Sequence, residues 1–158
     1  MGSVMIAPPS TLRTDDQIVN YYAQAAEAVG ADVPFVVQDY PLVTSVVMTP
    51  GVIRRIATDN ANCVMLKHED WPGLEKISTL RKWQSEGALK PMSILVANGG
   101  LFLDFEMERG ADGANPGYAF DCLWAARAAG ARWVVLCDTN GGTLPAEIGR
   151  VVREVIAA

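Results

Sequence analysis

One lysine in this sequence stands where nucleophilic chemistry is expected. Lys67 follows the apolar run 63–66 and is followed at once by His68, Glu69 and Asp70. The apolar run predicts a buried strand, and the polar residues predict the loop at its carboxyl end, where parallel α/β folds place their active sites. A partly desolvated lysine there can attack a carbonyl as the neutral amine and form a Schiff base. The alternative is a lysine that ends a strand and extends its head into water.

Two loops add candidate binding groups. Residues 98–100 and 140–142 both read Asn-Gly-Gly, and each triplet follows a predicted strand and precedes a predicted helix. Free backbone N–H groups in such loops can hold a carboxylate or a phosphate, so Asn98 and Gly99 are candidate substrate-binding residues. Tight turns between a strand and a helix account for Gly-Gly pairs equally well.

Predicted strands and helices alternate along almost the whole chain. The predicted strands cover residues 4–7, 34–38, 63–66, 93–97, 110–114 and 133–137. The predicted helices cover residues 15–29, 50–58, 73–85, 101–108, 121–129 and 145–156. Thr14 and Gly30 are expected to cap the first helix, and Thr49 and Pro50 to open the second. Strands separated by helices predict parallel pairing with right-handed crossovers.

This alternation predicts an α/β fold in which residues 1–158 form one domain with a parallel sheet of about six βα units. A closed TIM barrel has eight such units and typically about 250 residues. The chain is therefore expected to be a partial TIM barrel, and the alternative is an open, doubly wound, flavodoxin-like sheet. An open parallel sheet has two edge strands with unpaired backbone groups, which favours a homodimer.

Composition narrows the classes of function. The net charge of −5 comes with no basic stripe, so nucleic acid is not expected as a partner. No apolar run approaches the roughly 20 residues of a membrane span, and no signal peptide is recognised, so a cytoplasmic protein is expected. Cys63, Cys122 and Cys137 lie in or beside apolar stretches and are expected to be buried thiols rather than metal ligands. Lys76 and Lys82 are expected on a solvated helix face.

Motifs between about residues 4 and 120 resemble the dihydrodipicolinate synthase and N-acetylneuraminate lyase superfamily. Along the chain they are Ala7-Pro8-Pro9, Gln38-Asp39-Tyr40-Pro41 with Thr44, Val64-Met65-Leu66-Lys67-His68-Glu69, and the Gly-rich run 110–117. Their order and spacing match strands four to eight of that family's barrel. In the family the matching lysine forms a Schiff base with pyruvate or a related 2-oxo acid, and the resemblance gives that role to Lys67.

The same resemblance implies the partners of Lys67. Aligned through Pro41, the family's active-site tyrosine falls on Gln38, and Tyr40 lies two residues further on, on the same strand face. Gln38 and Tyr40 are therefore the expected polar partners, and Asn115 in the Gly-rich run is a further candidate for substrate binding. The family's Gly-Thr-Thr-Gly-Glu-type loop, which binds the substrate carboxylate, has no match in this sequence.

From about Leu123 to its end the chain resembles a different family. The run 129–145, which ends in Asp-Thr-Asn-Gly-Gly-Thr-Leu-Pro, is similar to citramalate synthase and its isopropylmalate synthase relatives. Those enzymes bind a divalent metal through an Arg-Asp-Gly aspartate and a His-x-His pair, neither of which occurs here. The two resemblances place a family junction near residues 119–123, between a part over 4–120 and a part over 123–158.

Two functions follow from these resemblances. The first is a chimeric or engineered barrel fragment whose catalysis is absent or vestigial, because half of the substrate site is missing. The second is a class I, Schiff-base aldolase or lyase that acts on pyruvate or a related small 2-oxo acid through Lys67. Such an enzyme would be a carbon–carbon or carbon–oxygen lyase of the dihydrodipicolinate synthase type, with no cofactor and no metal.

Overall fold

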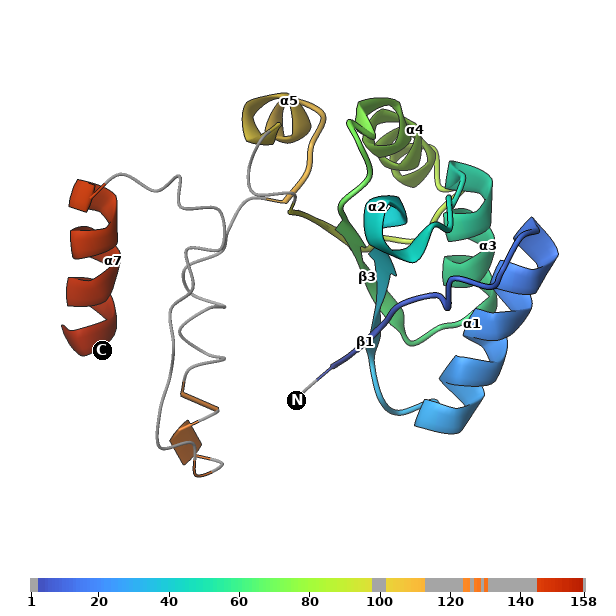
Figure 1. The fold of residues 1–158 in the computed structure, drawn as a ribbon, viewed down its shortest axis with the longest axis horizontal. Coiled ribbons are helices and arrows are strands. Elements are labelled where there is room, and N and C mark those ends of the chain that lie inside the picture. The colour runs from blue at the N-terminus through green and yellow to red at the C-terminus, as the bar shows by residue number, and fades with distance from the viewer. Residues whose placement is uncertain are drawn as a thin grey trace. The chain divides into compact units, whose positions relative to one another are not determined.

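The structure is a computed structural model that describes residues 3–97, 102–112, 124–125, 127–128, 130 and 145–157. The chain divides into two compact units, Met1–Gly113 and Ala114–Ala158, and each is described by itself. The first unit contains β1 (Val4–Ile6), α1 (Asp15–Val29), β2 (Phe35–Asp39), α2 (Pro41–Thr44), α3 (Pro50–Asp59), β3 (Cys63–His68), α4 (Leu74–Ser85), β4 (Ser93–Val96) and α5 (Leu103–Glu108), as Figure 1 shows. The described part of the second unit includes the helix α7 (Pro145–Ala157).

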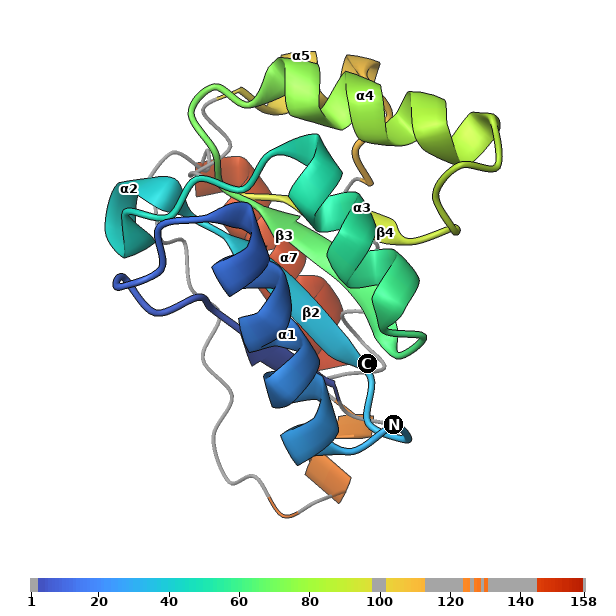
Figure 2. The same cartoon turned by 90° about the vertical axis from the view of Figure 1, so that its right-hand side faces the viewer.

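The first unit is built on a four-stranded parallel sheet in the order β1-β2-β3-β4. Figures 1 and 2 show α1 and α3 side by side over one face of this sheet. Ile6, Val37, Leu66 and Ile94 lie next to one another across the four strands, and all four are buried. The predicted α/β class and the parallel pairing of its first four strands are confirmed.

Local sequence explains where the helices of this unit begin. The Thr14 hydroxyl accepts a hydrogen bond from the backbone N–H of Gln17, and the Gln17 side-chain oxygen accepts one from the backbone N–H of Thr14, which is a capping box. At α3 the Thr49 hydroxyl accepts from the backbone of Val52, and Pro50 occupies the first helical position. These expected starts of the first two long helices are confirmed.

Three differences between the observed and the predicted elements bear on the structure around Lys67. The strand predicted over 63–66 extends to His68, because the ladder continues through the pairs Gln38–Lys67 and Asp39–His68. Lys67 therefore lies inside the strand and not after it. The short helix α2 was not predicted, and its first residue Pro41 has the backbone angle that a helix start requires. Of the strand predicted over 110–114, Asp112 forms a single parallel bridge to Leu95.

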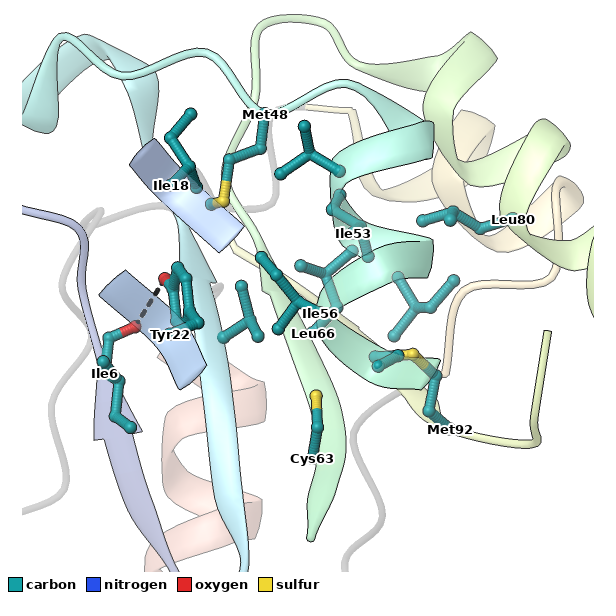
Figure 3. Close-up of a cluster of buried hydrophobic side chains, with 14 of the residues drawn as sticks. Ile6, Ile18, Tyr22, Met48, Ile53, Ile56, Cys63, Leu66, Leu80 and Met92 are labelled. Atoms are coloured by element: carbon teal, nitrogen blue, oxygen red, sulfur yellow. Dashed lines mark hydrogen bonds between the residues drawn. The ribbon is translucent and has the colours of Figure 1, made fainter. Parts of the chain in front are cut away.

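The hydrophobic core lies between the sheet and the helices that cover it. Figure 3 shows Tyr22 of α1 among aliphatic side chains, with its hydroxyl donating a hydrogen bond to the carbonyl of Ile6 at 3.0 Å. Tyr22 also stacks on Phe35, with ring centroids 6.3 Å apart. Cys63 is buried in the same core, and burial raises the pKa of its thiol to about 11. The expectation of a buried thiol is confirmed at Cys63, whereas Cys122 and Cys137 lie outside the described residues.

Candidate functional site

Strand β3 places Lys67 on the sheet face opposite the core. The residues before and after it, Leu66 and His68, are fully buried, and alternation along a strand turns Lys67 to the other side. In the register of the sheet Lys67 lies between Gln38 of β2 and Leu95 of β4. About a quarter of its side chain (26%) is exposed to solvent.

A carboxylate oxygen of Glu69 links Lys67 to Gln38, one of its predicted partners. Lys67 Nζ lies 3.3 Å from Glu69 Oε2, and the same oxygen accepts a hydrogen bond of 3.1 Å from Gln38 Nε2. Glu69 is only 10% exposed, and its backbone N–H donates to the carbonyl of Asp39, which fixes the residue beside the end of β2. The structure therefore brings Lys67 and Gln38 together through Glu69, a residue that was not among the predicted partners.

The remaining predicted site residues are Tyr40, Asn98, Gly99 and Asn115. Tyr40 is the N-cap of α2, where its carbonyl accepts hydrogen bonds from Val43 and Thr44. Its hydroxyl has no hydrogen bond among the described residues, and its role as a partner of Lys67 stays a prediction. Asn98, Gly99 and Asn115 lie outside the described residues.

A second cluster of charged side chains lies on the core side of the same strand ends. Lys76 of α4 is 6% exposed and forms two ion pairs, at 2.6 Å with Asp39 Oδ2 and at 2.8 Å with Asp70 Oδ2. Burial disfavours the charged form of Asp70, but the hydrogen bond and charge of Lys76 outweigh it and lower the pKa of Asp70. His68 is fully buried beside this cluster, with Nδ1 3.4 Å from Asp39 Oδ2.

This cluster corrects one prediction. Lys76 was expected on a solvated helix face, but the carboxylates of Asp39 and Asp70 draw its ammonium group inward. Lys82, six residues further along α4, is 71% exposed as expected. The pattern of α4 alone could not separate the two lysines, because the partners of Lys76 come from a strand end and a loop.

Gly73 keeps this region compact. It has the left-handed backbone conformation (φ +58°) that favours glycine, immediately before α4. A Cβ at this position would overlap the His68 ring at Nε2 and lie 2.9 Å from the Cβ of Asp70. A glycine is therefore required for β3 and the start of α4 to approach each other.

The described residues contain neither a candidate metal site nor a candidate membrane span. No group of His, Cys, Asp and Glu side chains in this part of the chain is arranged to hold a metal ion. No helix in the described ranges is long and apolar enough to cross a membrane.

Two solved structures are similar to this chain in fold. Dihydrodipicolinate synthase from Rhodopseudomonas palustris is 65% identical and superimposes with a TM-score of 0.70, over 80% of this chain and 44% of that chain. YagE from Escherichia coli K12, a member of the dihydrodipicolinic acid synthase family solved in complex with pyruvate, is 17% identical with a TM-score of 0.56. It covers 98% of this chain, and the chain spans 48% of it. The predicted partial TIM barrel is confirmed.

Two curated proteins similar to part of the chain belong to another family. (R)-citramalate synthase from Aquifex aeolicus is 55% identical over 53 residues, which are 32% of this chain and 10% of that protein. The enzyme of the same name from Synechocystis is 49% identical over 53 residues. The chain is similar to two enzyme families. No family model matches it.

The residues matched in the two comparisons add up to more than the length of the chain. One covers 80% of it and the other 32%, so some residues are matched by both. The chain also spans less than half of the Rhodopseudomonas palustris protein and a tenth of the Aquifex aeolicus one. The position of the family junction near residues 119–123 stays a prediction.

Proposed function

We propose that the chain is a chimeric barrel fragment in which Lys67 still forms an imine with a small 2-oxo acid, whereas efficient turnover is lost. The observation that carries this proposal is the group of Lys67, Gln38 and Glu69 at the carboxyl end of neighbouring parallel strands. This edge is where barrel enzymes gather their reacting groups. Similarity to dihydrodipicolinate synthase over four fifths of the chain supports the same role for the lysine.

The chemistry that these residues allow can be written step by step. The Lys67 ammonium gives one proton to solvent, which the exposed part of the side chain permits. The neutral Nζ then bonds to the carbonyl carbon of the 2-oxo acid, and the carbonyl oxygen leaves as water to give the imine. Glu69 and Gln38 limit where the amine lies during the attack.

Turnover is expected to be slow because the sequence has no counterpart of the loop that binds the substrate carboxylate in the resembled family. Correct positioning of a substrate can contribute roughly 7 to 11 kcal/mol to lowering a reaction barrier. A bound 2-oxo acid that is poorly positioned therefore forms the imine but proceeds slowly.

Exchange of the methyl hydrogens of pyruvate tests this proposal. An imine of pyruvate passes to its enamine by losing a C3 proton to solvent, and takes up deuterium when it returns in heavy water. We expect NMR to show slow exchange above the buffer rate in the native chain and none above it in Lys67→Arg. Equal exchange in both proteins would contradict the proposal. Pyruvate is chosen because the YagE structure holds it.

We also propose that the chain forms a homodimer through its sheet. In the described unit β1 is paired on one side only, by β2. Val4 and Met5 of this strand are 42% and 50% exposed. Parallel sheets are normally covered on both faces, so self-association would bury this surface. Sedimentation should show a concentration-dependent dimer that Met5→Lys weakens, and a monomer at all concentrations would contradict it.

A further inference from the structure

The carboxylate of Glu69 lies close to the position that the carboxylate of a 2-oxo acid would occupy in an imine with Lys67. Glu69 Oε2 is 3.3 Å from Lys67 Nζ, and the Glu69 side chain is 10% exposed. In the imine, the carboxylate carbon of the 2-oxo acid is two bonds from that nitrogen, about 2.5 Å away. With the nitrogen where the structure places it, this carbon would therefore lie within about 6 Å of Glu69 Oε2.

The contacts of Glu69 within the described ranges do not offset the resulting repulsion. When Lys67 attacks as the neutral amine, Glu69 loses the cation with which it is paired. The other partner of the same oxygen is the uncharged amide of Gln38, at 3.1 Å. The ammonium group of Lys76 is already paired with two carboxylates on the core side of the sheet. Like charges a few ångströms apart repel each other strongly where solvent screens them little.

The side of Lys67 away from Gln38 is apolar. In the register of the sheet Lys67 lies between Gln38 and Leu95, and Met65 precedes it by two residues on the same face of β3. Leu95 is 38% exposed, and Met65 is half-buried. Neither side chain donates a hydrogen bond to a carboxylate. Contact with them favours an uncharged group, because a charge placed against apolar surface loses hydration.

We propose that Lys67 reacts with uncharged carbonyl compounds, such as the amides and esters of 2-oxo acids, in preference to the 2-oxo acids themselves. This proposal rests on the imine chemistry proposed above and adds which charge the site accepts best. An uncharged group in place of the carboxylate is not repelled by Glu69 and suits the apolar surface of Leu95. The preference thus comes from an unfavourable contact with the competitor, which is a general source of specificity.

The bond changes are the same for charged and uncharged compounds. The lone pair of the neutral Lys67 nitrogen forms a bond to the carbonyl carbon, and the π electrons of the carbonyl move to its oxygen. The nitrogen gives up both of its hydrogens by way of solvent, and the oxygen leaves with two hydrogens as water. A charge beside the reacting carbon is present in one kind of compound and absent in the other, so Glu69 affects the two differently.

Pyruvate and pyruvamide are a matched pair of probes for this preference in the full chain. Both carry the same methyl ketone, and the amide replaces the carboxylate by an uncharged group of nearly the same size. Cyanoborohydride reduces each imine to a stable amine, and peptide mass spectrometry measures the adduct at each lysine. The exposed Lys82 reports the intrinsic reactivity of each probe. The quantity compared is therefore the ratio of the Lys67 adduct to the Lys82 adduct.

We expect this ratio to be several-fold higher for pyruvamide than for pyruvate in the native chain. Glu69→Gln should bring the two ratios together, because it removes the repelling charge and frees the amine equally for both probes. Glu75→Gln, an exposed change on α4, should leave the preference unchanged. A native ratio that is equal or lower for pyruvamide would overturn the proposal without any variant. A preference that survives in folded Glu69→Gln would overturn it as well.

The same measurement distinguishes this preference from the imine chemistry on which it rests. A pyruvate adduct at Lys67 above that at Lys82, with no preference for pyruvamide, would retain the imine chemistry and reject the selection by charge. Adducts at Lys67 no greater than those at Lys82 with both probes would reject the imine chemistry and the selection with it. A raised adduct at Lys67 with pyruvamide alone would support the selection and contradict a 2-oxo acid as the compound bound.

Discussion

The amine nitrogen of Lys67 lies 3.3 Å from Oε2 of Glu69, and Gln38 donates a hydrogen bond to the same oxygen. The three side chains lie on the sheet face away from the core, at the carboxyl end of β2 and β3. This ion pair holds the lysine nitrogen toward Glu69. Glu69 therefore positions the amine and at the same time limits its freedom to reach a carbonyl.

Removing the charge of Glu69 should release the amine. Glu69→Gln keeps a side chain of the same shape but removes the ion pair that holds the amine. We expect Lys67 to react a few-fold faster with an amine-acylating reagent, because breaking a partly exposed ion pair costs about 1 kcal/mol or less. Peptide mass spectrometry after competitive labelling gives the rate, and Glu75→Gln, an exposed change on α4, is the control. An unchanged or slower rate in Glu69→Gln would contradict the restraint.

The buried ion pairs of Lys76 should matter far more for stability than those of exposed lysines. Lys76→Met leaves Asp39 buried without its cation, which should cost about 3 to 5 kcal/mol of unfolding free energy. Lys82→Met, at an exposed position on the same helix, should change it by less than about 0.5 kcal/mol. Urea denaturation measures both, and similar losses in the two variants would show that the Lys76 cluster is not formed.

Gly73 and Gly87 have similar backbone angles, so comparing alanine at the two sites distinguishes backbone strain from the steric overlap of an added side chain. Gly73 and Gly87 both have positive φ, at +58° and +74°, so alanine at either site costs about 1 to 2 kcal/mol in backbone strain. Alanine at Gly73 also meets the His68 ring, whereas nothing lies within 4 Å at Gly87. Gly73→Ala should therefore lose about 1 to 3 kcal/mol more than Gly87→Ala in thermal unfolding. Equal losses would mean that the His68 ring does not lie against Gly73.

Neighbouring tyrosines of α1 give a matched test of the core. Tyr22→Phe removes the hydrogen bond to Ile6 in a buried site and should cost about 1 to 2 kcal/mol, because the carbonyl loses its partner. Tyr21→Phe removes a hydrogen bond of the same length to Ala7 at the surface, where water replaces it. Chemical denaturation should show a smaller loss there, and the reverse order would contradict the packing of β1 on α1.

Sequence patterns predicted most of the first unit because local signals agreed with the final packing. Apolar runs marked β2, β3 and β4, and the capping box at Thr14 marked the start of α1. The site was predictable to the extent that parallel strands bring their carboxyl ends together, which places Lys67 beside Gln38. The burial of Lys76 and Glu106 was not predictable, since each depends on side chains distant in the sequence.

Reductive trapping tests the role of Lys67 most directly. Borohydride reduces an imine between pyruvate and a lysine to a stable secondary amine, which peptide mass spectrometry locates on the chain. The account predicts a pyruvate-dependent adduct on Lys67 well above that on the exposed Lys82, and none at position 67 in Lys67→Arg. Glu69→Gln should increase the adduct. An adduct on Lys67 no greater than on Lys82, with the fold intact, would contradict the account.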